Sequence, residues 1–325
     1  MNFLISVFIF LFIFFLYLHI THQYKRSEDL EIYELDYIHN SHLQEVCNVK
    51  QPVIFDFNPV DNFLLTKLKN DIFENNETGD LKIKDSDDYF REHSGDLAVD
   101  YIVLPFQSAY TLMKTDPKSH YFTENNNEFV EESNLYDSIR DFDEYLKPPM
   151  IAQTKYDFCT GSKNAVTPLR YHTYYRQNYL VTHGKISIKM TPFKSSKYLR
   201  PNKDFENYEF WSPINAWKPQ EKYKNEMDKI KFLEFDVLEG YIICIPPYWW
   251  YSIQYMTEDT DMVGFNYNSV MNVVANIPDY TMCFIQQQNI KTKITNTVHF
   301  TENLVKSVED DEEEKEENIK IEKSI

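Results

Sequence analysis

Residues 151–275 consist of short apolar runs separated by turns, and this pattern constrains the fold more than any other feature of the chain. The runs include "IAQTKYDF", "QNYLVTH", "KISIKM", "YIICIPP" and "WWYSIQY". Regularly spaced strands of this length favour a β-sandwich or a small barrel. Helical spacings of apolar residues occur before the strands, at 58–76 and 126–146. The sequence therefore predicts a mainly β fold with N-terminal and C-terminal helices, interrupted by a long insert at 192–235.

An unbroken apolar run, "FLISVFIFLFIFFLYL" (3–18), lies near the N-terminus. With His19 and Ile20 it reaches the length that a membrane-spanning helix needs. A cleaved signal peptide would carry a basic stretch before the run and small residues after it, and neither is present. A buried core helix is the other alternative, but six phenylalanines spread over every face of one helix are hard to pack in a soluble domain. We expect an uncleaved transmembrane anchor at 1–20.

Two observations predict the orientation of this single-pass membrane protein. Lys25 and Arg26 are the basic residues close to the span, and the positive-inside bias places them in the cytosol. The cysteines lack the short paired spacings of a zinc ribbon or a disulfide framework, which favours free thiols in a reducing compartment; they are Cys47, Cys159, Cys244 and Cys283. The soluble domain is expected to be cytosolic.

Charge and glycine content exclude several classes of function. The formal net charge is -18, which repels a phosphate backbone, so nucleic acid is not an expected partner. Glycine occurs only 6 times, and no phosphate-binding or dinucleotide-binding glycine pattern is present. The run "EDDEEEKEE" (309–317) cannot bury a core. We expect a polar linker at 21–46, one domain at 47–290 and a helical to disordered acidic tail at 291–325.

Three motifs in order carry a resemblance to a known family. The segments "TPLRYH" (167–172), "HGKISIKMTPFKSSKYLRP" (183–201) and "LEGYIICIPPYWWYSI" (238–253) are similar to the JmjC or cupin-like hydroxylases, in particular to the factor-inhibiting-HIF type. The resemblance covers roughly 50–275. It implies a double-stranded β-helix, also called a jelly roll, that binds Fe(II) and 2-oxoglutarate through two histidines and one carboxylate.

The resemblance places the family's three metal ligands on residues that do not match them. The first histidine and the acid two residues later correspond to Arg170 and His172, which share one face of a strand. The distal histidine corresponds to Tyr251. Arginine has no lone pair to offer a metal, tyrosine ligates only as a phenolate, and one imidazole does not hold ferrous iron. We therefore predict no catalytic residue, no bound metal and no cofactor.

The co-substrate site of the resembling enzymes is also altered. Those enzymes carry a lysine two residues after a strand-turn glycine, whereas Gly184 is followed by Lys185 and then Ile186. Alternation places Ile186, with Ile188 and Met190, inside the barrel and Lys185 outside. Thr167 and Asn266 fall where the family has polar groups around the co-substrate, and both are retained.

Arg170 in a partly dry pocket needs an anionic partner. One hypothesis is a small bound anion, held by a pocket of Thr167, Arg170, His172, Tyr251 and Asn266, because an arginine fork suits a carboxylate or phosphate. The alternative is that Arg170 pairs with a neighbouring acid in a filled barrel. We interpret Trp249 and Trp250 as core and rim aromatics, and His183 as a surface histidine.

Together these observations predict a membrane-anchored JmjC/cupin-like domain that is a catalytically inactive pseudo-hydroxylase and works as a binding or scaffolding module. Its expected partners are the membrane, through residues 3–20, and a protein or a small anion. The alternative is an active Fe(II)/2-oxoglutarate-dependent protein hydroxylase with an atypical ligand set, and a third class is a purely structural membrane protein. The resemblance also implies a homodimer through the C-terminal helical region, at 278–308.

Overall fold

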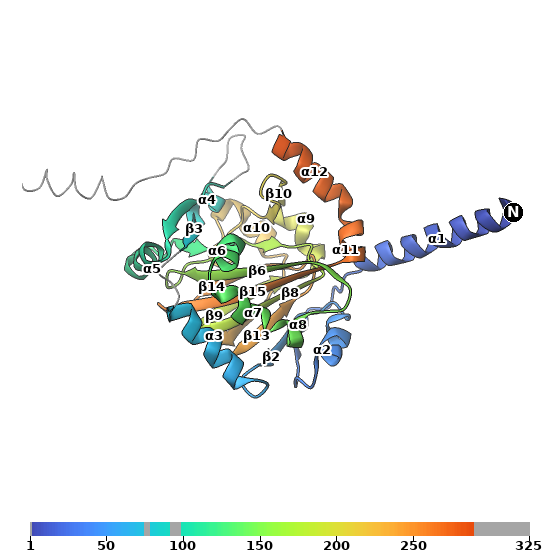
Figure 1. The fold of residues 1–325 in the computed structure, drawn as a ribbon. Helices are drawn as coiled ribbons and strands as arrows, with labels where there is room; N and C mark the ends of the chain where they lie inside the picture. The colour runs from blue at the N-terminus through green and yellow to red at the C-terminus, as the bar shows by residue number, and fades with distance from the viewer. Residues whose placement is uncertain (1, 75–78, 92–98, 289–325) are drawn as a thin grey trace, which may run out of the picture. The chain divides into compact units, whose positions relative to one another are not determined.

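The computed structural model describes residues 2–74, 79–91 and 99–288, and two β-sheets dominate them. Their strands account for most of the ordered core in Figure 1. The first sheet, in spatial order, contains β1 (Tyr33–Glu34), β2 (Val53–Asp56), β13 (Tyr241–Ile245), β8 (Arg176–His183), β15 (Thr260–Ser269), β6 (Ile151–Gly161), β5 (Tyr121–Thr123), β3 (Asp80–Asp85) and β4 (Ile102–Pro105). The second contains β10 (Asn202–Asp204), β11 (Glu209–Trp211), β7 (Arg170–Tyr171), β14 (Trp250–Tyr255), β9 (Lys185–Thr191) and β12 (Leu233–Leu238). The predicted mainly β fold is confirmed.

Helices lie before, between and after the strands, as the apolar spacings predicted. The helices of the described residues are α1 (Asn2–Gln23), α2 (Asn40–Cys47), α3 (Asn62–Glu74), α4 (Ser86–Phe90), α5 (Phe106–Thr115), α6 (Asn127–Glu132), α7 (Leu135–Arg140), α8 (Asp143–Leu146), α9 (Ser196–Leu199), α10 (Lys224–Met227), α11 (Val270–Ala275) and α12 (Ile277–Gln288). Two single turns of 3-10 helix, η1 (Phe193–Ser195) and η2 (Glu221–Tyr223), precede α9 and α10.

The two sheets pack face to face as a sandwich. On β9, Ile186, Ile188 and Met190 point between the sheets and have no exposed surface. Lys185 points the other way, and its ammonium lies 2.6 Å from the Asp236 carboxylate on β12. The predicted alternation along this strand is therefore confirmed. The alternation arises because successive side chains of a strand point to opposite faces of the sheet, so that one face packs in the core and the other faces solvent.

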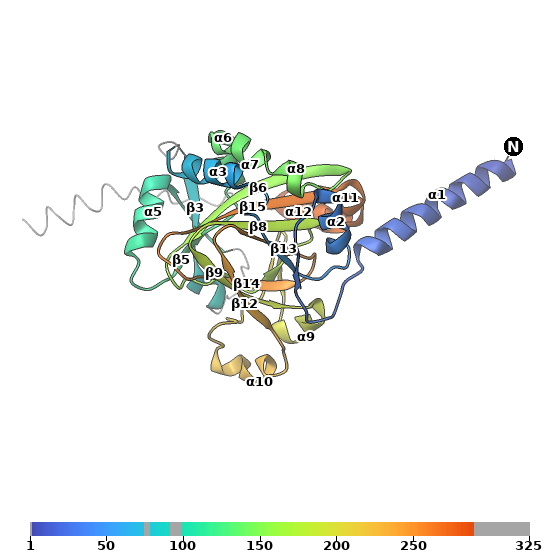
Figure 2. The same ribbon diagram turned by 90° about the horizontal axis from the view of Figure 1, so that it is seen from below.

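Each sheet has a second packed face. In Figure 2, α3, α6, α7 and α8 cover the outer face of the nine-stranded sheet, and α9 and α10 lie on the far side, beyond the six-stranded sheet. The insert predicted at 192–235 supplies that second cover. Trp250 is fully buried beneath it and donates a hydrogen bond of 2.7 Å from its indole N–H to the Ser196 hydroxyl. Trp249 is also buried, so both tryptophans of the pair interpreted as core and rim aromatics lie in the core.

The N-terminal helix α1 is long and apolar enough to cross a membrane. Its 22 residues extend about 33 Å at 1.5 Å per residue, close to the ~30 Å hydrocarbon core of a bilayer. None of the apolar window is buried against the rest of the protein. The alternative of a buried core helix is therefore wrong, because the phenylalanines of α1 contact no protein core.

The segment after α1 packs against the sheets, which differs from the polar linker expected at 21–46. The guanidinium of Arg26 lies 3.7 Å from the ring centre of Phe193 and 4.2 Å from that of Tyr248. Strand β1 then pairs parallel to β2. Arginine stacking on aromatic faces fixes this polar segment, and composition alone does not reveal it. The acidic tail predicted at 291–325 lies outside the described residues.

The turn Glu239-Gly240-Tyr241 connects β12 to β13 and requires its glycine. Gly240 has φ +83°, a backbone conformation that L side chains rarely adopt. A Cβ at this position would also overlap the amide of Asn58. The close approach fixes the direction in which β13 returns between β2 and β8.

Candidate functional site

The three residues at the resembling family's ligand positions lie in one cluster. Arg170 on β7 is directly opposite Tyr251 on β14 in the ladder between these strands. The Arg170 guanidinium lies 5.6 Å from the centre of the Tyr251 ring, and the His172 ring centre lies 5.7 Å from the same point. The intervening Tyr171 packs on the outer face of the sheet. Alternation along this strand thus brings Arg170 and His172 to the face that Tyr251 occupies.

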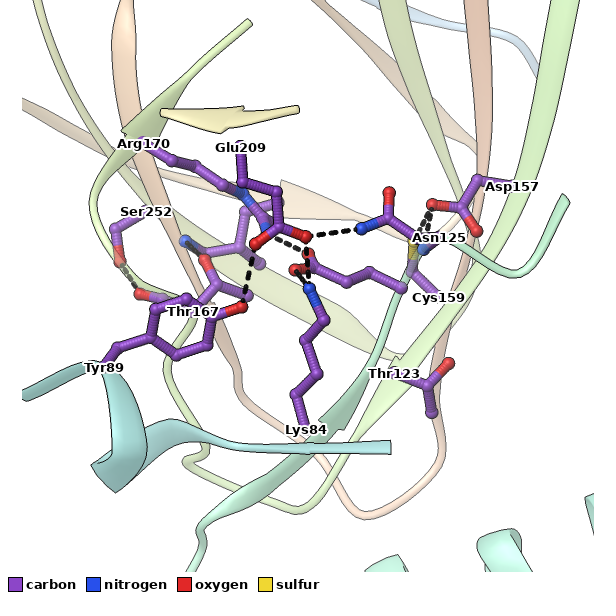
Figure 3. A network of polar contacts seen from close by, with 12 residues as sticks. Lys84, Tyr89, Thr123, Asn125, Asp157, Cys159, Thr167, Arg170, Glu209 and Ser252 are labelled. Atoms are coloured by element: carbon purple, nitrogen blue, oxygen red, sulfur yellow. Dashed lines mark hydrogen bonds and ion pairs between the residues drawn. The ribbon is translucent and has the colours of Figure 1, made fainter. Parts of the chain in front are cut away.

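Arg170 forms a buried ion pair with Glu124, which follows β5. The two side chains are each less than a tenth exposed. Glu124 also lies 3.2 Å from the ammonium of Lys84 on β3, and Lys84 in turn pairs with Glu209 on β11. We call these four residues the charge cluster, and Figure 3 labels Lys84, Arg170 and Glu209 among them. Its two cations and two carboxylates sum to zero.

The pKa values show how strongly the charge cluster holds its ionised forms. Burial alone would raise the pKa of Glu124, but the charges of Arg170 and Lys84 outweigh it and lower that pKa to about 2. Burial alone would lower the pKa of Arg170, but Glu124 outweighs it and holds the pKa well above the ordinary arginine value. Glu124 and Arg170 are therefore both charged at neutral pH, and each is compensated from within the chain.

Neighbouring polar groups extend the charge cluster on both sides. The Tyr89 hydroxyl donates to one oxygen of Glu209 at 3.2 Å, and the Asn125 side-chain amide donates to the other at 2.8 Å. Asp157 on β6 accepts the backbone N–H groups of Asn125 at 2.9 Å and Asn126 at 2.7 Å. These bonds fix the loop that carries Glu124, and so hold its carboxylate against Arg170.

Tyr251 is a neutral phenol in a hydrogen-bonded trio. Gln177 on β8 donates from its side-chain amide to the Tyr251 and Tyr179 hydroxyls, at 3.0 Å each. The two hydroxyls lie 3.2 Å apart. Burial raises the pKa of Tyr251 to about 12, even though the Arg170 charge acts in the opposite direction. A phenolate, the form that ligates metals, is therefore absent at neutral pH.

His172 keeps its lone pair but stands beside a cation. Burial, and next the Arg170 charge, lower the pKa of His172 to about 3, so its imidazole is neutral. Its ring packs near that of Tyr174, with 5.5 Å between the ring centres. The same positive charge that keeps His172 neutral also repels a metal dication.

Thr167 and Asn266, the other two residues of the predicted pocket, serve different parts of the interior. The Thr167 hydroxyl accepts the backbone N–H of Ile253 at 2.9 Å, which ties the chain before β7 to β14. Asn266 on β15 is opposite Gln177 in the ladder with β8, and it is buried next to the hydrogen-bonded trio to which Gln177 belongs. Its side-chain oxygen has no hydrogen-bond partner among the described residues. Arg170, His172 and Tyr251 thus lie together, Asn266 lies beside them through Gln177, and Thr167 serves the backbone. The charge of Arg170 is balanced by a carboxylate of the chain, although its Nε–H has no hydrogen-bond partner among the described residues.

Sequence reasoning did not find the residues that complete the charge cluster, namely Lys84, Glu124 and Glu209. Glu124 lies 46 residues before Arg170, and Glu209 lies in the insert. Lys82 and Lys84 sit two apart on the same strand, yet Lys82 reaches the surface and pairs with Glu128 while Lys84 is buried. Local pattern does not distinguish the two lysines.

Two other polar features lie away from Arg170. A hollow of about 850 Å³ is lined by residues of the β1–α2 segment, β2 and α8, and includes none of the five predicted pocket residues. Asp85 and Asp87 flank the imidazole of His120. Its Nδ1 is 3.9 Å from the Asp85 carboxylate, and its Nε2 is 3.5 Å from the Asp87 carboxylate. Each ring nitrogen faces a different carboxylate, which suits an imidazole bridging two acids better than three donors converging on one ion.

His183, interpreted as a surface histidine, is half-buried at the end of β8. Its Nδ1 lies 3.9 Å from the buried carboxylate of Asp261. Burial lowers the pKa of His183.

No protein-family model and no curated protein match the chain.

Proposed function

We propose that this chain is a membrane-anchored jelly-roll protein of the JmjC/cupin-like type, in which an internal charge cluster has replaced the metal centre, and that it works as a binding or scaffolding module. One observation carries the proposal. At the position of the family's first ligand, Arg170 forms a buried ion pair with Glu124. A site that holds its own counter-ions does not need a metal to balance them.

The strand order supports the jelly-roll interpretation. Four consecutive strands of the first sheet, β13, β8, β15 and β6, form one set. Four consecutive strands of the second sheet, β7, β14, β9 and β12, form the other. Every neighbouring pair within these two sets is antiparallel. The chain crosses repeatedly between the sets as it runs from β6 to β15, and such crossing supports the proposal of an eight-stranded jelly roll.

The residues present do not fit Fe(II) and 2-oxoglutarate. His172 is the one residue at the three ligand positions that offers a neutral lone pair of ordinary basicity for a metal, and Arg170 is a cation at the first of these positions. The nearby carboxylates of Glu124 and Glu209 are already paired with Arg170 and Lys84. A metal would have to break a buried ion pair to gain a ligand, which costs more than a surface exchange.

A small anion would likewise have to compete with Glu124 for Arg170. Glu124 already balances the charge of Arg170. An added carboxylate or phosphate would therefore either displace Glu124 from a buried position or bring an uncompensated charge to the unpartnered Nε–H of Arg170. We therefore favour a protein partner over a small anion. The anchoring helix α1 would keep such a partner at a membrane surface, with the jelly roll on the cytosolic side where the positive-inside bias places Lys25 and Arg26.

The test is anaerobic incubation of the full chain, purified in detergent, with Fe(II) and 2-oxoglutarate. We expect calorimetry to detect no saturable binding of 2-oxoglutarate, and admission of oxygen to release no succinate above a metal-free control. Saturable binding followed by succinate release would favour the alternative, an active hydroxylase with an atypical ligand set. An Arg170→Met variant tests the part played by the cation, because it removes the Arg170 charge and leaves Glu124 paired with Lys84.

A further inference from the structure

Helix α12 contacts the rest of the protein through one face only. The Tyr280 ring stacks on Tyr208 with 5.1 Å between ring centres, and Asn268 donates to the Tyr280 hydroxyl at 3.4 Å. Two turns later, the Gln287 amide donates to the carbonyl of Glu206 at 3.2 Å. Residues seven apart lie on the same face of a helix. Tyr280 and Gln287 therefore define the face of α12 that meets the protein.

A flank of α12 is apolar and exposed. The exposed fractions are 51% for Ile277, 63% for Phe284 and 48% for Ile285. Together with Thr281, these residues follow the i, i+4, i+7, i+8 spacing of one stripe, which we call the α12 stripe. Asp279 and Gln286 lie on the opposite flank, and Met282, which is 48% exposed, lies between the two flanks. A contiguous apolar stripe of this kind marks an interaction surface rather than ordinary scattered exposure.

The α12 stripe begins where the apolar helix α1 meets the body of the protein. The Tyr24 hydroxyl, one residue after α1, donates a hydrogen bond to the carbonyl of Ala275 at the end of α11. Helix α1 also contacts α11 directly. Helix α12 starts two residues after Ala275, and Figure 1 shows α11 and the start of α12 beside the C-terminal end of α1.

We propose that α12 lies on the bilayer surface beside α1, with the α12 stripe in the boundary between headgroups and acyl chains. This inference rests on the proposed membrane anchoring by α1. If α1 spans the bilayer, its C-terminal end lies at the membrane surface, and the contact between Tyr24 and Ala275 holds the start of α12 at the same level. An amphipathic helix with one apolar flank is the form that binds in the plane of a membrane interface.

The sequence of α12 indicates the kind of lipid. Residues 277–288, "IPDYTMCFIQQQ", contain no lysine or arginine and one acid. Binding therefore depends on the apolar side chains and not on anionic headgroups. A neutral phosphatidylcholine bilayer should be sufficient. The competing occupant is a second copy of the chain, which would cover the same stripe in a homodimer.

The experiment places a fluorophore on either flank of α12 in the full chain. Two variants, Thr281→Cys and Gln286→Cys, are made in a Cys283→Ser background and labelled with an environment-sensitive dye. Thr281 lies in the middle of the α12 stripe, so its replacement leaves all three apolar anchors in place. Gln286 on the other flank is the matched control. Both proteins are reconstituted into phosphatidylcholine vesicles, with or without brominated acyl chains.

We expect the dye at position 281 to shift its emission to shorter wavelength in vesicles and to lose intensity with brominated lipid, while the dye at 286 does neither. Adding Phe284→Ser and Ile285→Ser should abolish the shift at 281. If the chain floats with the vesicles but both positions behave as in water, the anchor stands and the α12 inference fails. If the chain does not float, the anchor fails as well. Pyrene excimer emission at 281 that fades as unlabelled chain is added would assign the stripe to a second copy and overturn the inference.

Discussion

The charge cluster makes a quantitative prediction for the pair Arg170 and Glu124. In Arg170→Met, Glu124 remains buried with Lys84 at 3.2 Å as its remaining cation. In Glu124→Gln, Arg170 loses its carboxylate altogether, while Lys84 keeps Glu209. Removing one partner of a buried ion pair costs about 3–5 kcal/mol. We expect about 3 kcal/mol for Arg170→Met, because Lys84 compensates Glu124 in part, and about 5 kcal/mol for Glu124→Gln.

The double variant separates the ion pair from general damage to the fold. Neither an unpaired cation nor an unpaired carboxylate remains after both changes, so the double variant should be more stable than the sum of the single effects by about 2 kcal/mol or more. Urea unfolding of the full chain in detergent, followed by fluorescence of its 4 tryptophans, measures all three values.

A surface pair provides the matched control for this cycle. Arg140 and Asp137 form an exposed ion pair one helical turn apart, at 2.9 Å. Arg140→Met should cost below about 1 kcal/mol. A stability cost of Arg170→Met no greater than that of Arg140→Met, or simply additive effects at Arg170 and Glu124, would contradict a stabilising buried ion pair between them.

Three further predictions concern other residues of the account. Lowering the pH from about 7.5 to about 5.5 should cost up to about 1.4 kcal/mol of unfolding free energy in the wild type relative to His172→Gln. The unfolded imidazole takes up a proton near its ordinary pKa of 6.5, whereas folded His172, with a pKa of about 3, does not. Equal pH dependence of the two unfolding curves would contradict this. Gly240→Ala should destabilise the protein by about 2 kcal/mol in the same assay. A second change, Asn58→Gly, should restore part of that stability because it removes the side chain that the new Cβ would overlap. An unchanged stability of Gly240→Ala would rule out the close approach at that turn. Tyr251→Phe should cost about 1 kcal/mol, because it leaves the Gln177 amide and the Tyr179 hydroxyl short of one partner; a gain in stability would show that the trio is not formed.

The sequence predicted the strands, their inward faces and the meeting of three side chains. These features depend on a period of two along each strand, which Ile186, Ile188 and Met190 express without any knowledge of the partner strand. The same period placed Arg170 and His172 together, and the resemblance brought Tyr251 to them. The apolar helix α1 was equally clear, because its length and lack of charge are local properties.

What the sequence did not predict depends on contacts between distant residues. The choice between a small anion and an internal acid as the partner of Arg170 was left open, since nothing near Arg170 in the chain points to Glu124. Which of Lys82 and Lys84 is buried depends on the elements that cover β3. The packing of Arg26 on Phe193 and Tyr248 likewise joins residues far apart in sequence, so a segment that is polar in composition was expected to be a linker.

We propose that the interior keeps the side-chain arrangement of a metal site while its charges exclude the metal. The measurement is the iron content after anaerobic loading with Fe(II) and gel filtration, in the wild type and in a triple variant. The triple variant, Arg170→His, His172→Asp and Tyr251→His, restores the resembling family's ligand set. We predict no stoichiometric iron in the wild type and one iron per chain in the triple variant. Stoichiometric iron in the wild type, or none in a folded triple variant, would contradict the account.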